Sequence, residues 1–507
     1  MAGPLPGLDM SGAWDIPARL NMAAQCLAQD AGRTAIIDLT GDVRRDVSYG
    51  DLSGMADGLA RSLLPRVRAG DRVGVLLSQS PWCAAAHLAI WKIGAISVPL
   101  FKLFKYDALK SRVQDAGITL VLTDAEGRDL LDDLAEAWMA DTVGIAGDPV
   151  PFADTGPDDP AVLIYTSGTT GSPKGALHGH RVLTGHLPGV SLSHDVLGAQ
   201  GDCLWTPADW AWIGGLFDVL MPALALGVPV VAARLPKFSP EDCARIIADG
   251  GVRNVFFPPT ALRMLKAAGA EISGLRSVAS GGEPLGAEML AWGQSAFGLT
   301  INEFYGQTEC NMVASSCAAR FPARAGCIGK AVPGHDVAVI DGDGMPTLAE
   351  GDVAIRRGSA AMMLGYWQRP EATAEKFRGD WMITGDRGIW EGEYLRFVGR
   401  EDDVITSSGY RIGPAEIEDC LLTHPDVATC GVVGKPDALR TEIVKAYVVR
   451  KTGSSVDAAT LQDWCKTRLA SYSYPREITF LDALPMTVTG KVIRKDLKAL
   501  ATSEQTP

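Results

Sequence analysis

Residues 165–175 combine glycines, hydroxylated side chains and one lysine, which is the composition of a phosphate-binding loop. They read YTSGTTGSPKG and directly follow the apolar residues 161–164, for which we expect a buried strand. Glycines let the backbone approach an anion closely, hydroxyl groups donate hydrogen bonds to it, and a lysine adds a mobile positive charge. The candidate phosphate ligands are Thr166, Ser167, Gly168, Thr169, Thr170, Gly171 and Lys174.

This run differs from the Walker loop of P-loop nucleotidases. That motif requires a serine or threonine directly after Gly-Lys, whereas here Pro173 precedes Lys174 and Gly175 follows it. We therefore expect a different nucleotide chemistry. A flexible linker rich in serine and glycine is the alternative, but the position after a buried strand favours a phosphate loop.

Further short segments follow in a fixed order along the chain. They are GGEP at 281–284, YGQTE at 305–309, TGD at 384–386, GREDDVITSSGYRIGPAEIE at 399–418 and TVTGKVIRKDL at 487–497. Together with the first run, they resemble the signature of the adenylate-forming superfamily, which includes acyl-CoA synthetases, luciferases and the adenylation domains of peptide synthetases. The resemblance extends over nearly the whole chain, and segment 399–418 is particularly similar to medium-chain acyl-CoA synthetases.

The resemblance implies that ATP activates a carboxylate and that CoA then takes the acyl group. Attack of the carboxylate on the α-phosphorus requires donors and a divalent ion that neutralise negative charge. The resemblance assigns the catalytic roles to Thr308 for the α-phosphate, Glu309 as a ligand of Mg²⁺, and Lys491 for the carboxylate and phosphate. Taken alone, a Thr-Glu pair or a late lysine would be an ordinary surface feature. Only their joint occurrence in these segments favours function.

The same resemblance places the rest of the nucleotide. Asp386 would accept the ribose hydroxyls and Arg400 would add a second contact, although an aspartate in a turn is common without any ligand. Tyr305 would offer a stacking face to the adenine. The remaining candidate ATP ligands lie in the GGEP turn and the YGQTE run: Gly282, Glu283, Pro284, Gly306, Gln307 and Thr308, and Lys491 also belongs to this set.

Thioester formation requires a second arrangement of the site. The thiol of CoA must reach the carbonyl where Lys491 stood before, so a hinge is expected. Asp402 matches the hinge residue of the family, and a following loop matches the segment that lines the pantetheine tunnel. The loop residues are Ser408, Gly409, Tyr410 and Arg411. Ordinary turn chemistry is the alternative explanation for Gly409.

The size of the acyl pocket is predicted from two glycines. Acetate-activating relatives carry a tryptophan directly before Gln-Thr-Glu and a valine directly before Gly-Glu-Pro, whereas this chain has Gly306 and Gly281. Room for additional methylenes, at about 0.8 kcal/mol for each one buried, would favour a medium-chain, branched or aromatic acid. Trp212, Ile213 and Gly214 complete the expected pocket, while Trp205 and Trp210 are equally well explained as core residues.

The resulting prediction is an AMP-forming acyl-CoA synthetase that uses ATP, CoA and Mg²⁺. Three alternatives remain open: a short-chain ligase for acetate or propionate, a stand-alone adenylation enzyme that loads a carrier protein, and a non-catalytic nucleotide-binding regulator. The regulator is disfavoured because Lys174, Glu309, Asp386 and Lys491 are all present.

Composition limits the other partners. The net charge of −13 argues against a nucleic-acid or anionic membrane surface. The ten cysteines show no zinc spacing, so reduced buried thiols are expected, and His178 and His180 are assigned to packing or polar lining rather than to a metal. Neither a signal sequence nor a spanning apolar stretch is found, which predicts a cytoplasmic protein without stable membrane insertion. The patterns carry no signal for an oligomeric state.

With 507 residues, the chain should form at least two domains. Strands expected at 72–77, 119–123, 228–232, 252–257 and 277–280 alternate with helices such as 81–93 and 239–250, which is an α/β pattern. We expect a large N-terminal domain of mixed sheets with flanking helices and a β subdomain (1–399), a hinge (400–403) and a small mobile α+β C-terminal domain (404–507). The ends, 1–13 and 502–507, look poorly ordered.

Overall fold

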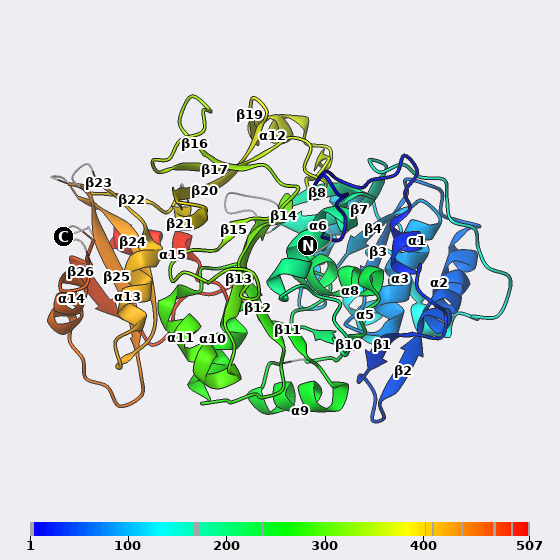
Figure 1. Ribbon diagram of the computed structural model, residues 1–507, viewed down its shortest axis with the longest axis horizontal. Coiled ribbons are helices and arrows are strands. Elements are labelled where there is room, and N and C mark those ends of the chain that lie inside the picture. The colour runs from blue at the N-terminus through cyan, green and yellow to red at the C-terminus, as the bar shows by residue number, and fades with distance from the viewer. Residues whose placement is uncertain are drawn as a thin grey trace.

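The computed structural model describes residues 5–166, 173–235, 237–400, 402–407, 410–437, 440–469, 473–487 and 490–504. Within these residues, strands form four sheets that are flanked by helices (Figure 1). The predicted α/β class, with a larger N-terminal part of mixed sheets and a smaller C-terminal α+β part, is confirmed. The proposed boundaries at 399 and 404 stay a prediction.

Two large sheets are parallel in the middle; the nine-stranded sheet is antiparallel at both edges, and the seven-stranded sheet only at the edge formed by β18 (Gly365–Tyr366) and β8 (Lys174–Gly179). Their central strands are buried runs rich in β-branched residues, as expected where helices cover both faces. The seven-stranded sheet has the order β18 (Gly365–Tyr366), β8 (Lys174–Gly179), β7 (Pro160–Thr166), β4 (Ile96–Pro99), β3 (Arg72–Leu76), β5 (Leu120–Thr123) and β6 (Glu136–Met139). The nine-stranded sheet has the order β15 (Lys330–Ala331), β14 (Cys310–Ser315), β13 (Ile301–Gln307), β12 (Ser277–Gly281), β11 (Asn254–Phe256), β9 (Leu204–Trp205), β10 (Val230–Ala232), β1 (Thr34–Asp38) and β2 (Arg45–Ser48).

Two smaller sheets follow along the chain. The expected β subdomain is formed by β16 (Val337–Ile340), β17 (Gly351–Arg356), β19 (Phe377–Arg378), β20 (Trp381–Glu391) and β21 (Tyr394–Arg400). The C-terminal sheet contains β22 (Ile405–Ser407), β23 (Tyr410–Ile412), β24 (Val427–Asp437), β25 (Thr441–Arg450) and β26 (Glu477–Phe480). This last sheet has a hydrophobic core of its own, which includes Ile417, Leu421, Val432 and Val448, so the C-terminal part has the core that a separate domain requires.

The helices begin where their sequences provide caps. The side chain of Ser80 accepts a hydrogen bond from Cys83 N at the start of α3 (Pro81–Lys92), and Ser239 does the same for α9 (Pro240–Gly250). Both helices were expected. The other helices are α1 (Met22–Cys26), α2 (Tyr49–Leu63), α4 (Tyr106–Ala116), α5 (Ala125–Leu131), η1 (Ala140–Thr142), α6 (Val182–Ser193), α7 (Ile213–Gly215), the π-helix η2 (Leu216–Leu220), α8 (Met221–Leu226), α10 (Pro259–Ala267), α11 (Gly286–Phe297), α12 (Pro370–Glu375), α13 (Pro414–Leu422), α14 (Ala458–Lys466) and α15 (Arg494–Ser503).

The C-terminal part packs beside the second large sheet. Figure 1 shows α13 next to α10 and α11, and α13 contacts α11 directly. Segments that are distant in sequence therefore meet between the two parts of the chain. The contact between Lys491 and Gly282, described below, also joins these two parts.

The expectation of disorder at the ends was wrong for the described residues. Leu5 and Leu8 are each 7% exposed and pack with Leu192, Cys317 and Val332. Likewise, α15 continues through Thr502 and Ser503. A short apolar pair at a chain end is sufficient to dock that end when the rest of the fold presents a buried surface for it.

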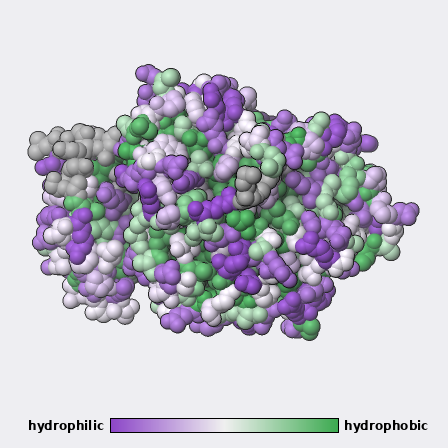
Figure 2. Space-filling model, viewed as in Figure 1, coloured by the Kyte–Doolittle hydropathy of each residue, from purple (hydrophilic) through white to green (hydrophobic). Residues whose placement is uncertain are grey.

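The surface carries no concentrated apolar area on the face drawn in Figure 2, where hydrophilic and hydrophobic residues are interspersed. The large exposed apolar side chains, such as Met10, Val43 and Leu348, come from separate parts of the chain, and isolated residues of this kind are normal on protein surfaces. Among the described residues, none of the helices has the length and apolar character needed to span a membrane. All ten cysteines are buried and free, as expected.

Candidate active site

Thr308 and Glu309 occupy the tip of a hairpin. Strand β13 ends at Gln307, β14 begins at Cys310, and these two flanking residues pair with each other, so only Thr308 and Glu309 connect the strands. A two-residue connection fixes both side chains relative to the sheet. The sequence pair thus becomes a rigid feature at the end of two buried strands.

The carboxylate of Glu309 is buried and held from a distant segment. Glu309 is only 8% exposed, and the hydroxyl of Tyr366 donates a hydrogen bond to its Oε1. The backbone N–H of Met363 donates to the carbonyl of Glu309 at 2.8 Å. The ammonium of Lys174 lies 5.3 Å from the centre of the Tyr366 ring, so Tyr366 joins the end of the candidate phosphate loop to Glu309.

The residues around Glu309 fit a Mg²⁺ ion that phosphate oxygens also bind. Within the described ranges, no group of three or more His, Cys, Asp or Glu side chains could hold a metal ion. Mg²⁺ at nucleotide sites is commonly bound through one or two carboxylates together with substrate phosphates. A single buried carboxylate beside the lysine of a phosphate loop fits that mode of binding.

Asp386 lies at the centre of a polar cluster. The hydroxyl of Tyr305 donates to Asp386 Oδ2 at 2.5 Å, Gln307 Nε2 lies 3.5 Å from the same oxygen, and Arg400 Nε lies 3.7 Å from Oδ1. Burial raises the pKa of Asp386, and the positive charge of Arg400 opposes this shift. The predicted pair Asp386 and Arg400 is brought together because β20 and β21 place these two residues opposite each other.

Lys376 is a member of this cluster that the sequence did not reveal. Its ammonium donates to Gln307 Oε1 at 2.9 Å and to the carbonyl of Ile383 at 3.1 Å. Burial lowers the pKa of Lys376, while the nearby carboxylates of Glu309 and Asp386 act in the opposite direction. Lys376 belongs to none of the motifs, because its role depends on how the β subdomain packs against the hairpin.

Lys491 reaches this region from the C-terminal part of the chain. Its Nζ donates to the carbonyl of Gly282 at 3.0 Å. Thr487 holds the turn that carries the lysine, since its Oγ1 accepts from Lys491 N at 3.0 Å. Gly490 has φ +80°, and a Cβ there would lie 2.7 Å from the side chain of Thr260, so a glycine allows the turn to rest on α10.

The turn at 281–284 also receives a contact from α10. Arg263 Nη2 donates to Glu283 Oε2 at 2.8 Å. Gly282 has φ +101°, a conformation that favours glycine. The turn is thus fixed on one side by Arg263 and meets Lys491 on the other.

Aromatic side chains surround the predicted acyl pocket. Trp212, at the start of α7, makes edge contacts with Phe101 and Phe104 at centroid distances of 5.2 and 5.9 Å. Trp205 and Trp210 are fully buried, in agreement with their interpretation as core residues. The next residues, Ile213 and Gly214, continue the helix from Trp212 toward the π-helix η2.

Phenylalanine rings fill the space expected beside Gly281 and also lie beside Gly214. A Cβ at Gly281 would lie 2.5 Å from the ring of Phe304, and one at Gly214 would lie 3.1 Å from Phe256. The two rings contact each other, with centroids 5.1 Å apart. The missing valine at position 281 is therefore replaced by the ring of Phe304.

The room expected beside Gly306 is occupied by Asn311 of the neighbouring strand. A Cβ there would overlap Asn311 Oδ1 and lie 2.5 Å from Met312 N. The cause is an irregularity between β13 and β14 near Tyr305 and Gln307, which turns position 306 toward the neighbouring strand. Gly306 is required by this close approach of two strands.

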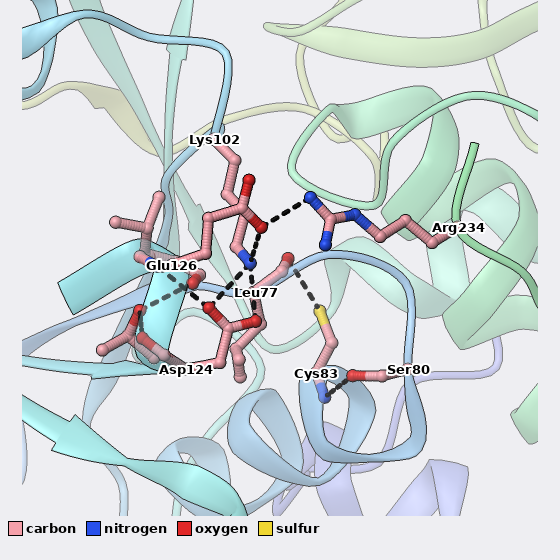
Figure 3. A network of polar contacts seen from close by, with 10 residues as sticks. Leu77, Ser80, Cys83, Lys102, Asp124, Glu126 and Arg234 are labelled. Atoms are coloured by element: carbon pink, nitrogen blue, oxygen red, sulfur yellow. Dashed lines mark hydrogen bonds and ion pairs between the residues drawn. The ribbon is translucent and has the colours of Figure 1, made fainter. Parts of the chain in front are cut away.

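An ion-pair network around the buried ammonium of Lys102 supports the segment that carries Phe101 and Phe104. Lys102 Nζ contacts Asp124 at 2.5 Å and Glu126 at 3.1 Å, and Arg234 reaches the same Glu126 oxygen at 2.5 Å (Figure 3). In Figure 3 the lysine points into the acidic pair. This network, which the sequence did not indicate, links the turn after β4 to α5 and to the segment after β10.

Some of the predicted site residues lie outside the part of the chain that the structure describes. Ser167, Gly168, Thr169, Thr170 and Gly171 lie outside the described residues, as do Ser408 and Gly409. Tyr410 and Arg411 belong to β23. In the predicted hinge, Lys498 donates to the carbonyl of Asp402 and to Asp403 Oδ1, the latter at 3.0 Å.

The two histidines were correctly assigned to packing. His178 and His180 are both buried, and His180 Nδ1 accepts a hydrogen bond from Met22 N at 3.0 Å. Burial lowers the pKa of His178 to about 3 and that of His180 to about 4, so both rings are neutral.

The order of the motifs, the two-part fold and the contact of Lys491 with Gly282 are those of an adenylate-forming enzyme. The family model described as AMP-binding enzyme matches residues 23–367, and the model of the AMP-binding enzyme C-terminal domain matches residues 416–491. The chain belongs to this family. It is an AMP-forming acid–thiol ligase.

Individual relatives agree with this assignment. Acetyl-coenzyme A synthetase of Bacillus subtilis is 34% identical over 85% of this chain and 81% of its own length. The mitochondrial acyl-coenzyme A synthetase ACSM4 of Rattus norvegicus is 32% identical over 85% of this chain and 79% of its own length. The crystal structure of ATP-bound MatB from Rhodopseudomonas palustris has a TM-score of 0.84 and 27% identity to this chain. The match covers 96% of this chain and 99% of the MatB chain.

Proposed function

We propose that this enzyme converts a compact carboxylic acid into its CoA thioester through an acyl-adenylate. The observation that carries the proposal is the position of Lys491, whose ammonium reaches Gly282 beside the hairpin that bears Thr308 and Glu309. A positive charge from the second part of the chain thus enters the place where a carboxylate would meet an α-phosphate.

In the first half-reaction, a carboxylate oxygen attacks the α-phosphorus and pyrophosphate leaves. Lys491 neutralises the charge that the two anions bring together, and the hydroxyl of Thr308 donates to the α-phosphate. Asp386, oriented by Tyr305, accepts from the ribose hydroxyls, and Arg400 provides a second contact. Thr166 and Lys174 flank the loop proposed for the β- and γ-phosphates.

Mg²⁺ would be held by Glu309 together with phosphate oxygens. When bound, it supplies positive charge to the phosphates during displacement of pyrophosphate. Tyr366 keeps the Glu309 carboxylate in one orientation. Mg²⁺ as the metal and a cytoplasmic location are further parts of the proposal.

In the second half-reaction, the thiolate of CoA attacks the acyl carbonyl and AMP leaves. Lys491 occupies the approach to that carbonyl, so the C-terminal part has to rotate, with the hinge at Asp402 within 400–403. Ser408, Gly409, Tyr410 and Arg411 would then line the path of the pantetheine arm. These roles come from the family resemblance.

Among the acids that the sequence left open, the geometry favours branched or aromatic ones over long linear chains. Phe304 and Phe256 occupy the room that Gly281 and Gly214 would otherwise leave. A short acid is the second candidate, because the same rings shorten the pocket. The similarity to an acetyl-coenzyme A synthetase agrees with keeping the short acid as a candidate.

One assay separates the possible functions. AMP release is measured with a panel of short, branched, aromatic and linear medium-chain acids, each with and without CoA. The proposal predicts turnover that requires CoA and is highest for a compact acid. Adenylation that CoA does not stimulate would indicate transfer to a carrier protein, and ATP binding without AMP release from any acid would indicate a regulator.

A further inference from the structure

Asp218 is a buried carboxyl group that the proposed reaction does not use. It lies in the middle of the π-helix η2 and is 3% exposed. A π-helical turn inside a helix often occurs at a functional site, because it changes the direction of one side chain at a cost in backbone geometry. Burial raises the pKa of Asp218 well above its ordinary value, and the hydrogen bond from Asn311 opposes the shift.

The neighbours of Asp218 form a small polar set. Asn311 Nδ2 lies 2.8 and 2.9 Å from the two carboxyl oxygens, and His186 Nε2 lies 3.9 Å from Oδ1. His186 Nδ1 is 2.7 Å from the carbonyl of Val182, so Nδ1 carries the proton and Nε2 is a bare acceptor. Nε2 is buried and has no hydrogen-bond partner within the described part of the chain.

This polar set lies at the predicted acyl pocket. Asp218 Oδ2 is 3.6 Å from the position of a Cβ at Gly214, and Asn311 Oδ1 is the atom nearest to a Cβ at Gly306. Gly306 directly precedes the Gln307-Thr308-Glu309 run, and the family resemblance places the end of an acyl pocket at this position. Asn311 and Asp218 therefore stand where a bulky hydrocarbon wall would close the pocket.

The atoms available there favour a hydrogen-bond donor. Asn311 Oδ1 and His186 Nε2 are acceptors, and burial lowers the pKa of His186 to about 4, which keeps its ring neutral. A hydroxyl or amino group can donate to these acceptors whichever proton state Asp218 adopts, and it can also pair with the carboxyl group. A hydrocarbon in the same place would leave them buried without partners.

We propose that Asp218, Asn311 and His186 form the polar end of the acyl pocket and select acids whose acyl group carries a hydroxyl or amino group. The inference rests on the proposed acyl-CoA synthetase function and adds the chemical class of the acid. Sites built to pair with a substrate hydroxyl reject the analogue that lacks it by large factors, because their polar groups lose their partners.

The test uses matched acids that differ by one group. Butyrate is compared with 3- and 4-hydroxybutyrate and 4-aminobutyrate, and benzoate with its 2-, 3- and 4-hydroxy and amino derivatives, through kcat/KM for acid-dependent pyrophosphate exchange. For the best-placed substituent we expect a preference of at least about 100-fold over the parent acid. The Asp218→Leu variant should reduce this ratio at least about 10-fold and leave the KM for ATP unchanged.

Controls separate selection from folding. Asp202→Asn changes another buried aspartate, paired with Arg276 at 2.6 Å, and should alter thermal stability without altering the acid ratio. If Asp218→Leu does not fold, Asn311→Ala and the isosteric Asp218→Asn give the same comparison. The inference is overturned if kcat/KM of the wild-type enzyme is higher for every parent acid than for its substituted forms. It is also overturned if the variants lower kcat/KM equally for the parent and the substituted acids. Absence of pyrophosphate exchange with all acids would instead overturn the proposed function.

Discussion

The hydroxyl of Tyr366 holds the carboxylate of Glu309, although 57 residues separate the two in sequence. A similar relation joins Tyr305 to Asp386 and Lys376 to Gln307. In each pair, a residue from a motif is oriented by a residue outside that motif. Orientation of this kind decides how well a charged side chain meets a reacting group.

The Tyr366→Phe variant tests the orientation of Glu309. Loss of one hydrogen bond to a metal-binding carboxylate typically weakens metal affinity by a factor of about 10 to 100. We expect weaker Mn²⁺ binding to the enzyme–ATP complex, measured by electron paramagnetic resonance, and a higher Mg²⁺ requirement for pyrophosphate exchange.

Tyr106→Phe is the matched control, since Tyr106 is exposed and donates to Asp133 at 3.1 Å far from the hairpin. Unchanged Mn²⁺ affinity in Tyr366→Phe would show that the hydrogen bond has no role in metal binding.

The Lys491→Ala variant tests the role of the lysine in adenylation. Because its ammonium acts only while the α-phosphorus is attacked, acyl-adenylate formation should fall by about 100- to 1000-fold. Conversion of supplied acyl-adenylate to acyl-CoA should remain near the wild-type rate. Lys495→Ala, an exposed lysine on α15, is the control. Equal losses in both half-reactions would contradict the assignment.

Sequence patterns reached the motif residues but not their supports. Thr308, Glu309, Asp386 and Lys491 lie in contiguous runs of the sequence, so the family resemblance could name them. Tyr366 and Lys376 could not be found in this way, because each is a single residue whose role arises from tertiary contact. The direction of Gly306 depends on a strand irregularity that no pattern of residue types encodes.

Secondary structure elements were predicted more reliably than their surroundings. Strand β3 and helix α3 differ from the expected ranges by one residue at the C-terminal end, because hydrophobic runs and caps are local signals. The docking of residues 5–13 and the π-helix η2 were missed. Both depend on how distant elements pack, which local propensity does not determine.

The contact between α11 and α13 contains an acidic residue in a close fit. A Cβ at Gly286 would lie 2.9 Å from Asp419 Oδ1, so Asp419 rests on the start of α11. Burial raises the pKa of Asp419 from 3.8 to about 7, and the neighbouring carboxylates Glu418, Glu288 and Glu416 add to the shift. Burial also raises the pKa of Glu303, to about 8.

This contact should weaken as pH rises. The docked state holds the proton on Asp419 more tightly than the undocked state does, so docking is strongest below about pH 4 and declines until about pH 7. The equilibrium constant for docking falls by at most about tenfold per pH unit. Asp419→Asn removes this titration, so the ratio of variant to wild-type pyrophosphate exchange should rise from about pH 5.5 to 7 and then level off.

Asp463→Asn on α14 serves as the control, because that carboxylate is exposed and pairs with Lys466 in the next turn. A variant-to-wild-type ratio for Asp419→Asn that does not change with pH would show that Asp419 does not titrate in the docked state.

At the scale of the whole molecule, the proposed mechanism requires two arrangements of the two parts, one for each half-reaction. With Lys491 on Gly282, the C-terminal part covers the region where the acyl carbonyl would form. The family resemblance places Gly409 on the face that replaces Lys491 after rotation. The small C-terminal part would therefore take two positions, one for each of the two successive chemical steps.

The Gly409→Leu variant tests this alternation. A leucine would narrow the path of the pantetheine arm without touching the ATP site, so acyl-adenylate should accumulate while acyl-CoA formation falls by at least about 100-fold. Pyrophosphate exchange should stay near the wild-type rate, the reverse of the result expected for Lys491→Ala. Gly342→Leu provides the control, since Gly342 has no neighbouring atom within 4 Å of its Cβ position. If both variants lost both half-reactions, a single arrangement would have to perform them, and the rotation at 400–403 would have no role in catalysis.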